Sequence, residues 1–189
     1  MSLAFIFPGQ GSQSIGMGAD LAAAFASARE VFQEVDDALG QSLFKLMQDG
    51  PEGDLTLTEN AQPALMAVSA AVMWVLEKDF NVAVERAAFV AGHSLGEYSA
   101  LCAAGALGLA DTARLLKLRG QAMQRAVPVG VGAMASLIGP KTDVALAEAA
   151  AAEGAKIGVC AVANDNNNGN VVISGEKAAV DKAVEAAKE

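Results

Sequence analysis

Hydrophobic positions follow two different patterns along the chain. In the first two thirds, short apolar runs alternate with longer segments in which apolar residues recur every three to four positions. The runs predict buried strands of a parallel sheet, and the longer segments predict amphipathic helices. We expect strands at residues 3–7 and 87–91 and helices at residues 27–39, 42–49, 58–78, 95–104 and 110–126.

Local signals set the ends of several helices. Ser27 and Glu30 have the spacing of a capping box, which predicts Ser27 as an N-cap. Pro63 is compatible with a helix that begins at Thr58 if it occupies the first turn. Gly105 predicts the break before the last of these helices.

The pattern changes after residues 127–132, a Val, Pro and Gly segment that indicates a hinge. The elements expected beyond it are a strand at 133–138, a helix at 144–153, strands at 157–163 and 170–174 joined by a polar loop at 164–169, and a helix at 176–188. This is the order of a ferredoxin-like unit without its last strand, so the chain is expected to be truncated. The predicted class is α/β, with domains at residues 1–127 and 128–189.

Composition narrows the function classes. Hydrophobic residues make up 53% of the 189 residues, enough for a real core, and the net charge of −9 disfavours nucleic acid. The best membrane candidate, residues 65–76, is too short to span a bilayer, and no basic region precedes the first apolar run. Cys102 and Cys160 lie in unrelated contexts, so we expect apolar packing, no disulfide and a cytoplasmic location.

The strongest chemical signal is the sequence Gly-His-Ser-Leu-Gly at residues 92–96. An apolar run precedes it and a predicted helix follows, which is the context of a strand-to-helix corner that exposes a nucleophilic serine. Ser94 is therefore a candidate nucleophile, and the alternative is a simple turn. His93 is the only histidine. Neighbouring side chains diverge at such a corner, so we expect His93 to line the pocket and not to act as the base.

Two backbone N–H groups are candidates for stabilising an oxyanion. Leu95 follows the nucleophile and would supply the first. The loop at residues 8–13, which contains Gln10, would supply the second if it lies at the same sheet edge. A plain connection is the alternative for this loop.

Arg119 stands out by its position on the predicted helix. At about 100° per residue, it lies near the middle of an apolar side formed by Leu115, Leu116, Ala122, Met123 and Ala126. A guanidinium there needs an anion. The partner is either a structural carboxylate such as Glu97 or a substrate carboxylate held by two hydrogen bonds.

Other signals are weaker. Arg114, Lys117 and Arg125 share the outer face of the same helix. This is either an ordinary solvated face or a surface for an acidic carrier or nucleotide phosphates. The sequence has no zinc-ligand spacing, Walker loop or G-x-G-x-x-G motif, so no metal or nucleotide cofactor is predicted.

Three motifs in order give the chain a family resemblance. Residues 8–13, residues 92–99 and Arg119, which lies 25 positions after Ser94, together resemble the malonyl-CoA:acyl carrier protein transacylases of bacterial fatty-acid synthesis. The segment with Asn164 and Asn166, leading into residues 171–175, is also similar and makes these asparagines candidate site residues. The likeness runs from about residue 3 to the end of the chain.

The resemblance implies residue roles. Ser94 would be the acylated nucleophile, and the backbone N–H groups of Gln10 and Leu95 would form the oxyanion hole. Arg119 would hold the malonyl carboxylate, with Met123 nearby. Met123 and the expected cytoplasmic location favour malonyl over methylmalonyl, and the choice between them stays open. The implied reaction moves malonyl from coenzyme A to the serine and then to the phosphopantetheine thiol of the carrier protein, without a cofactor.

The resemblance also implies an α/β-hydrolase-like large subdomain with a ferredoxin-like insert. The family's catalytic histidine follows the small subdomain, and this chain ends before that point. We therefore expect a monomeric parent enzyme, and a fragment that is inactive or nearly so alone and associates through its exposed core. The rival interpretations are an acyltransferase domain of a polyketide synthase, a serine hydrolase of other specificity, and a carrier-binding fragment without activity.

Overall fold

The computed structural model describes residues 2–128, 130–167 and 169–188. The chain forms two compact units that divide between Gln124 and Arg125. The elements of the first unit are β1 (Leu3–Phe7), α1 (Ala19–Ala24), α2 (Ala26–Leu39), α3 (Leu43–Asp49), α4 (Glu52–Thr56), α5 (Thr58–Lys78), the 3₁₀ turn η1 (Val84–Arg86), β2 (Ala87–Gly92), α6 (Leu95–Ala103) and α7 (Leu109–Ala126).

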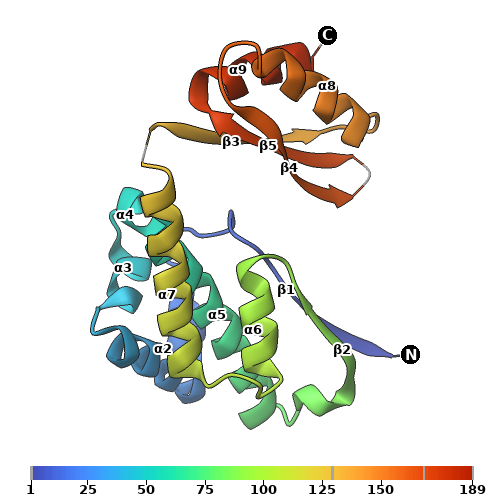
Figure 1. The fold of residues 1–189 in the computed structure, drawn as a ribbon. Helices are drawn as coiled ribbons and strands as arrows, with labels where there is room; N and C mark the ends of the chain where they lie inside the picture. Colours follow the sequence, from blue (N-terminus) through green and yellow to red (C-terminus); the bar gives the residue numbers. More distant parts are fainter. Residues whose placement is uncertain (1, 129, 168, 189) are drawn as a thin grey trace. The chain divides into compact units, whose positions relative to one another are not determined.

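The core of the first unit is helical and centres on α5, which packs against α2 and α6 (Figure 1). Met66 and Ala67 of α5 are buried with Val31 and Phe32 of α2. The Phe32 ring stacks on that of Phe44, with 4.2 Å between centroids. Small alanine side chains allow these helices to approach closely. Among the described helices, none is long and apolar enough to cross a membrane.

The strands of the first unit form a two-stranded parallel sheet in which Phe7 pairs with Gly92. One face, with Phe5, Phe7 and Val90, packs against Met73 of α5 and α6. On the other face Ile6 is 79% exposed and Phe89 is 73% exposed. The prediction of parallel strands is confirmed, but the prediction of buried strands is wrong, because only one face of this sheet is covered by helices.

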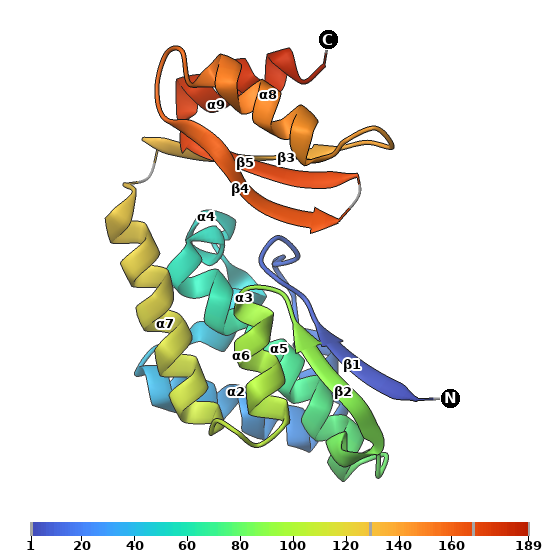
Figure 2. The same cartoon turned by 45° about the vertical axis from the view of Figure 1, so that its right-hand side comes forward.

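The second unit consists of β3 (Gly132–Ile138), α8 (Val144–Gly154), β4 (Cys160–Asn167), β5 (Asn170–Glu176) and α9 (Lys177–Ala186). Its antiparallel sheet has the order β3-β5-β4. Both helices cover one face of this sheet (Figures 1 and 2). The core between the two layers contains Leu137, Val171 and Ile173 from the strands and Ala147 and Val180 from the helices.

Several local predictions need correction. The polar segment 164–167, expected as a loop, is the second half of β4, because its backbone pairs with β5. The N-cap of α2 is Phe25 and not Ser27. Ser27 is buried and donates a hydrogen bond to Asp79. Pro63 lies in the second turn of α5 and not in the first. The short helices α1 and α4 were not expected.

Candidate active site

Ser94 lies at a sharp corner between β2 and α6. Its backbone has φ 55° and ψ −114°, a conformation that non-glycine residues rarely adopt and that is often found at functional sites. A Cβ on Gly92 would overlap the backbone of Gly96, and a Cβ on Gly96 would overlap the carbonyl oxygen of Phe7. Both motif positions therefore require glycine, because a larger residue would clash with the neighbouring backbone. The corner holds the serine at the N-terminus of α6.

The loop after β1 lies beside this corner. The His93 N–H donates to the Phe7 carbonyl at 3.1 Å. A Cβ on Gly9 would lie 2.5 Å from Nδ1 of His93. Leu95 is the first residue of α6, so its N–H has no acceptor within the helix. The structure thus brings together the two segments that sequence analysis selected for an oxyanion site, at the carboxyl ends of parallel strands.

The guanidinium of Arg119 reaches the serine from α7. Its Nη2 donates to Ser94 Oγ at 3.0 Å, and its Nη1 donates to Gln62 Oε1 at 2.6 Å. Its Cζ lies 5.9 Å from the centre of the Tyr98 ring. Glu97, the suggested structural partner, is exposed, and no ion pair among the described residues includes Arg119. The partners of this cation are therefore a hydroxyl and an amide and not a carboxylate.

Gln62 is the site residue that sequence analysis missed. Gln62 is fully buried, and its Nε2 donates to Sδ of Met123 at 3.3 Å. Met123 itself is 45% exposed. The only available signal was a single amide within the apolar part of α5, and no motif spacing marks such a position.

The predicted apolar side of α7 is wrong in most positions. Of the five residues assigned to it, only Leu116 is buried, whereas Leu115 and Met123 are 41% and 45% exposed. The buried positions are Leu109, Thr112, Ala113, Leu116 and Gly120. Gly120 fits directly against α5, where a Cβ would lie 2.5 Å from Cα of Glu59. Arg119 is half-buried beside this contact.

A polar network links α7 to α5 near the site. Lys117 Nζ lies 3.3 Å from Glu59 Oε2. It also donates to Gln41 Oε1 at 2.9 Å and to Asn60 Oδ1 at 2.8 Å. Arg114 pairs with a carboxylate of its own helix, Asp111, at 3.0 Å. Two of the three basic residues considered for a carrier surface are thus engaged within the unit, which favours the interpretation as an ordinary helix face.

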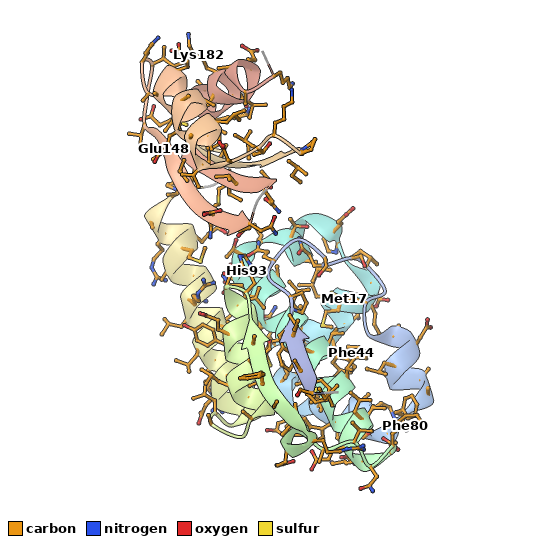
Figure 3. The ribbon with its side chains drawn as sticks, turned by 90° about the vertical axis from the view of Figure 1, so that its right-hand side faces the viewer. Met17, Phe44, Phe80, His93, Glu148 and Lys182 are labelled. Carbon is orange, nitrogen blue, oxygen red and sulfur yellow. The ribbon has the colours of Figure 1, made fainter. Side chains whose placement is uncertain are left out.

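The remaining candidates are one histidine, two asparagines and two cysteines. His93 is exposed at the end of β2 (Figure 3). Asn164 and Asn166 are in β4 of the second unit, where Asn166 Nδ2 donates to Asn170 Oδ1 at 3.4 Å; their part in the site stays a prediction. Burial raises the pKa of the Cys102 and Cys160 thiols. Within the described residues, no group of three or more His, Cys, Asp and Glu side chains could hold a metal ion.

The sequence of this chain is similar to those of known acyl transferases. A model of the acyl transferase domain matches residues 4–189. The malonyl CoA-acyl carrier protein transacylase of Escherichia coli strain K12 is 48% identical over 187 residues, which are 98% of this chain and 58% of the relative. The corresponding protein of Bacillus subtilis strain 168 is 46% identical over 187 residues, which are 99% of this chain and 57% of the relative.

The solved structures agree. The acyl-carrier-protein-S-malonyltransferase from Bartonella henselae has a TM-score of 0.91 and 58% identity, and the match covers 100% of this chain and 59% of that one. The chain therefore spans less than two thirds of the length of these relatives. Since the family match extends over nearly every residue, the chain belongs to the acyl transferase domain family.

Proposed function

We propose that this chain supplies the nucleophile and the carboxylate-binding group for transfer of malonyl from coenzyme A to an acyl carrier protein. The observation that carries the proposal is the 3.0 Å contact between Arg119 Nη2 and Ser94 Oγ. A guanidinium only donates hydrogen bonds and stays protonated, so it cannot activate the hydroxyl as a base. A cation beside the nucleophile instead favours an acyl group that carries its own anion, as malonyl does.

The corner geometry supports a two-step acyl transfer. Ser94 Oγ attacks the thioester carbonyl and loses its proton to a base, and the coenzyme A thiolate leaves. The N–H groups of Gln10 and Leu95 would stabilise the oxyanion, with help from the dipole of α6. The carrier thiol then loses its proton to a base and attacks the malonyl ester, and the Ser94 oxygen leaves and takes up a proton. The substrate is the coenzyme A thioester itself, and no step requires a cofactor.

A solved complex of a similar protein supports an acyl carrier protein as the partner. A solved structure described as a type II PKS acyl-carrier protein in complex with its malonyl-transacylase has a TM-score of 0.89 and 45% identity to this chain. It covers 100% of this chain, which spans 59% of that one. We infer that this chain takes part in recognising an acyl carrier protein as well as malonyl-CoA.

We also propose that the two units are an α/β-hydrolase-like domain and a ferredoxin-like domain. The parallel β1–β2 sheet followed by the Ser94 corner supports an α/β-hydrolase-like domain at residues 1–127. The order β3-β5-β4 supports a ferredoxin-like domain at residues 128–189, with the open edge of β3 available to a fourth strand. The exposed Ile6 and Phe89 support the expectation that this chain associates through its apolar sheet face.

Adding imidazole to the solution as a base tests the proposal. The chain is incubated with malonyl-CoA, with and without imidazole, and malonyl-Ser94 and malonyl carrier protein are followed by intact-protein mass spectrometry. We expect slow acylation without imidazole, because the group that contacts Ser94 Oγ is the Arg119 guanidinium, which cannot act as a base, and loss of a base costs several orders of magnitude. Imidazole should accelerate acylation, and Ser94→Ala should abolish it. Turnover without imidazole as fast as that of a full-length relative would contradict the expectation that Ser94 lacks a base.

Two arginine variants on α7 complete this experiment. Arg119→Ala should reduce the preference for malonyl-CoA over acetyl-CoA by about 10- to 100-fold, the effect of losing hydrogen bonds to a charged group. Arg125→Ala, at an exposed position of the same helix, should leave the preference unchanged. If Arg119→Ala retains the preference, the carboxylate-binding role fails and a serine hydrolase of other specificity becomes the better explanation.

A further inference from the structure

Gln62 occupies an unusual position for a glutamine. It lies on α5 in a stretch, residues 60–67, in which every residue is buried. Gln62 itself is 0% exposed to solvent. A buried primary amide is costly unless its polar atoms are paired. Both ends of this amide are paired, and both partners lie on α7.

The chemistry of the partners fixes the orientation of the amide. Arginine has donors and no acceptor, so the atom 2.6 Å from Arg119 Nη1 must be the oxygen of Gln62. The amide nitrogen then faces Met123 Sδ at 3.3 Å, a weak acceptor. Reversing the amide would oppose two donors in a buried space. Gln62 therefore presents a fixed acceptor to one arm of the guanidinium.

The backbone around this contact is also constrained. Gly120, the neighbour of Arg119, packs on Glu59 one turn before Gln62, where a Cβ would be 2.5 Å from the Glu59 Cα. The distance between α7 and α5 is thus set within a turn of the amide. With Nη1 held by Gln62, rotation of the guanidinium is restricted, and Nη2 remains at 3.0 Å from Ser94 Oγ.

We propose that Gln62 is a positioning residue that holds the Arg119 guanidinium toward Ser94 and so sets the preference for a carboxylate-bearing acyl group. The inference rests on the proposed function for its effect on selectivity, but the restraint on Arg119 is a property of the unliganded chain. Gln62 has no contact with the serine among its hydrogen bonds and acts through Arg119.

The restraint is tested without activity, by ¹⁵N NMR of the arginine side chains. We expect separate Nη signals for Arg119, because hydrogen bonds at both Nη atoms slow rotation. In Gln62→Met, which keeps a similar volume but lacks the amide, these signals should merge. In Gln62→Glu, which keeps an acceptor, they should stay separate. The signals of exposed Arg125 are the internal control. Separate Arg119 signals in folded Gln62→Met would overturn the proposal.

Selectivity is measured in parallel, by malonyl and acetyl labelling of Ser94 in the presence of imidazole. Gln62→Met should lower the malonyl preference by about tenfold, the effect of one hydrogen bond to a charged group. Gln62→Glu should lower it at least as much, because the new carboxylate opposes that of malonyl while Arg119 stays in place. Merged NMR signals with unchanged selectivity would overturn the link to specificity. If Gln62→Met fails to fold, unchanged selectivity in Gln62→Glu overturns that link.

The two tests separate this inference from the proposed function. Absence of Ser94 labelling in the unmodified chain would defeat the proposed function and leave the NMR result to decide whether Gln62 restrains Arg119. Labelling with a malonyl preference that does not respond to either Gln62 variant would leave the function standing and defeat the inference.

Discussion

The two helices that meet beside Ser94 are held in the first unit in different ways. α5 is buried on nearly every side from Asn60 to Ala67. α7 is buried only along a narrow strip that includes Leu116 and Gly120. Leu118 of α7 is 57% exposed. Figure 2 shows α7 at the edge of the unit, whereas α5 lies among the other helices of the unit.

The two helices therefore contribute to the site in different ways. A helix packed on all sides cannot shift without creating cavities, so α5 gives Gln62 a fixed position. α7 carries Arg119 on a helix whose position depends on contacts along one narrow strip. The site is therefore defined by α5 and adjustable through α7, and substitutions on the two helices should differ in size and kind.

The largest contrast is expected between large-to-small substitutions on the two helices. Met66→Ala on α5 removes a side chain with 0% exposure and should destabilise the chain by about 2–5 kcal/mol. Leu118→Ala on α7 removes an exposed side chain and should change the free energy of unfolding by less than about 0.5 kcal/mol. Urea unfolding monitored by circular dichroism measures both. Equal losses would mean that α7 is held as firmly as α5.

An intermediate effect is expected where the helices touch. Gly120→Ala places a methyl group 2.5 Å from the Glu59 Cα, so α7 must move and the loss should be about 1–3 kcal/mol. Gly108→Ala is the matched control, because nothing lies within 4 Å of a Cβ built there. The same unfolding measurement applies. A Gly120→Ala chain as stable as the control would show that α7 is not seated on α5 at this point.

The comparison also explains which parts could be predicted from the sequence. The Ser94 corner was predictable because close backbone contacts require glycine at both motif positions, Gly92 against Gly96 and Gly96 against Phe7, so the glycines appear at a fixed spacing around the serine. Long helices such as α5 were predictable from their apolar pattern. The short helices α1 and α4, with 6 and 5 residues, are too brief to show a period.

The errors arise where tertiary contacts decide. The periodicity of α7 favoured its large apolar residues as the buried side, but of those assigned to that side only Leu116 is buried, and the helix also packs through Thr112, Ala113 and Gly120. Gln62 was missed because a single buried amide is meaningful only once its partners on α7 are known. Residues 164–167 form strand although asparagine disfavours it, because pairing with β5 satisfies the backbone. Sequence patterns report local preference and not the neighbour that overrides it.

The smallest effect concerns the ion pair between the helices, Lys117–Glu59, whose side chains are 21% and 30% exposed. Burial raises the pKa of Glu59, but hydrogen bonds from Gln121 and Lys117 and the charge of Lys117 together outweigh it, so the pKa lies below its ordinary value of 4.5. A carboxylate with a lowered pKa stabilises the folded chain above its unfolded pKa and loses that effect as the pH falls through the folded pKa.

Glu59→Gln should therefore cost less than about 1 kcal/mol at neutral pH, and the difference from the unmodified chain should shrink once the pH falls below about 4.5. Unfolding free energies measured across this range test the sign. Glu30→Gln is the control, because its pair with Lys78 is more exposed, at 66% and 49%, and solvent screens it more strongly. A difference that grows on acidification would show that this ion pair does not help to hold α7 against α5.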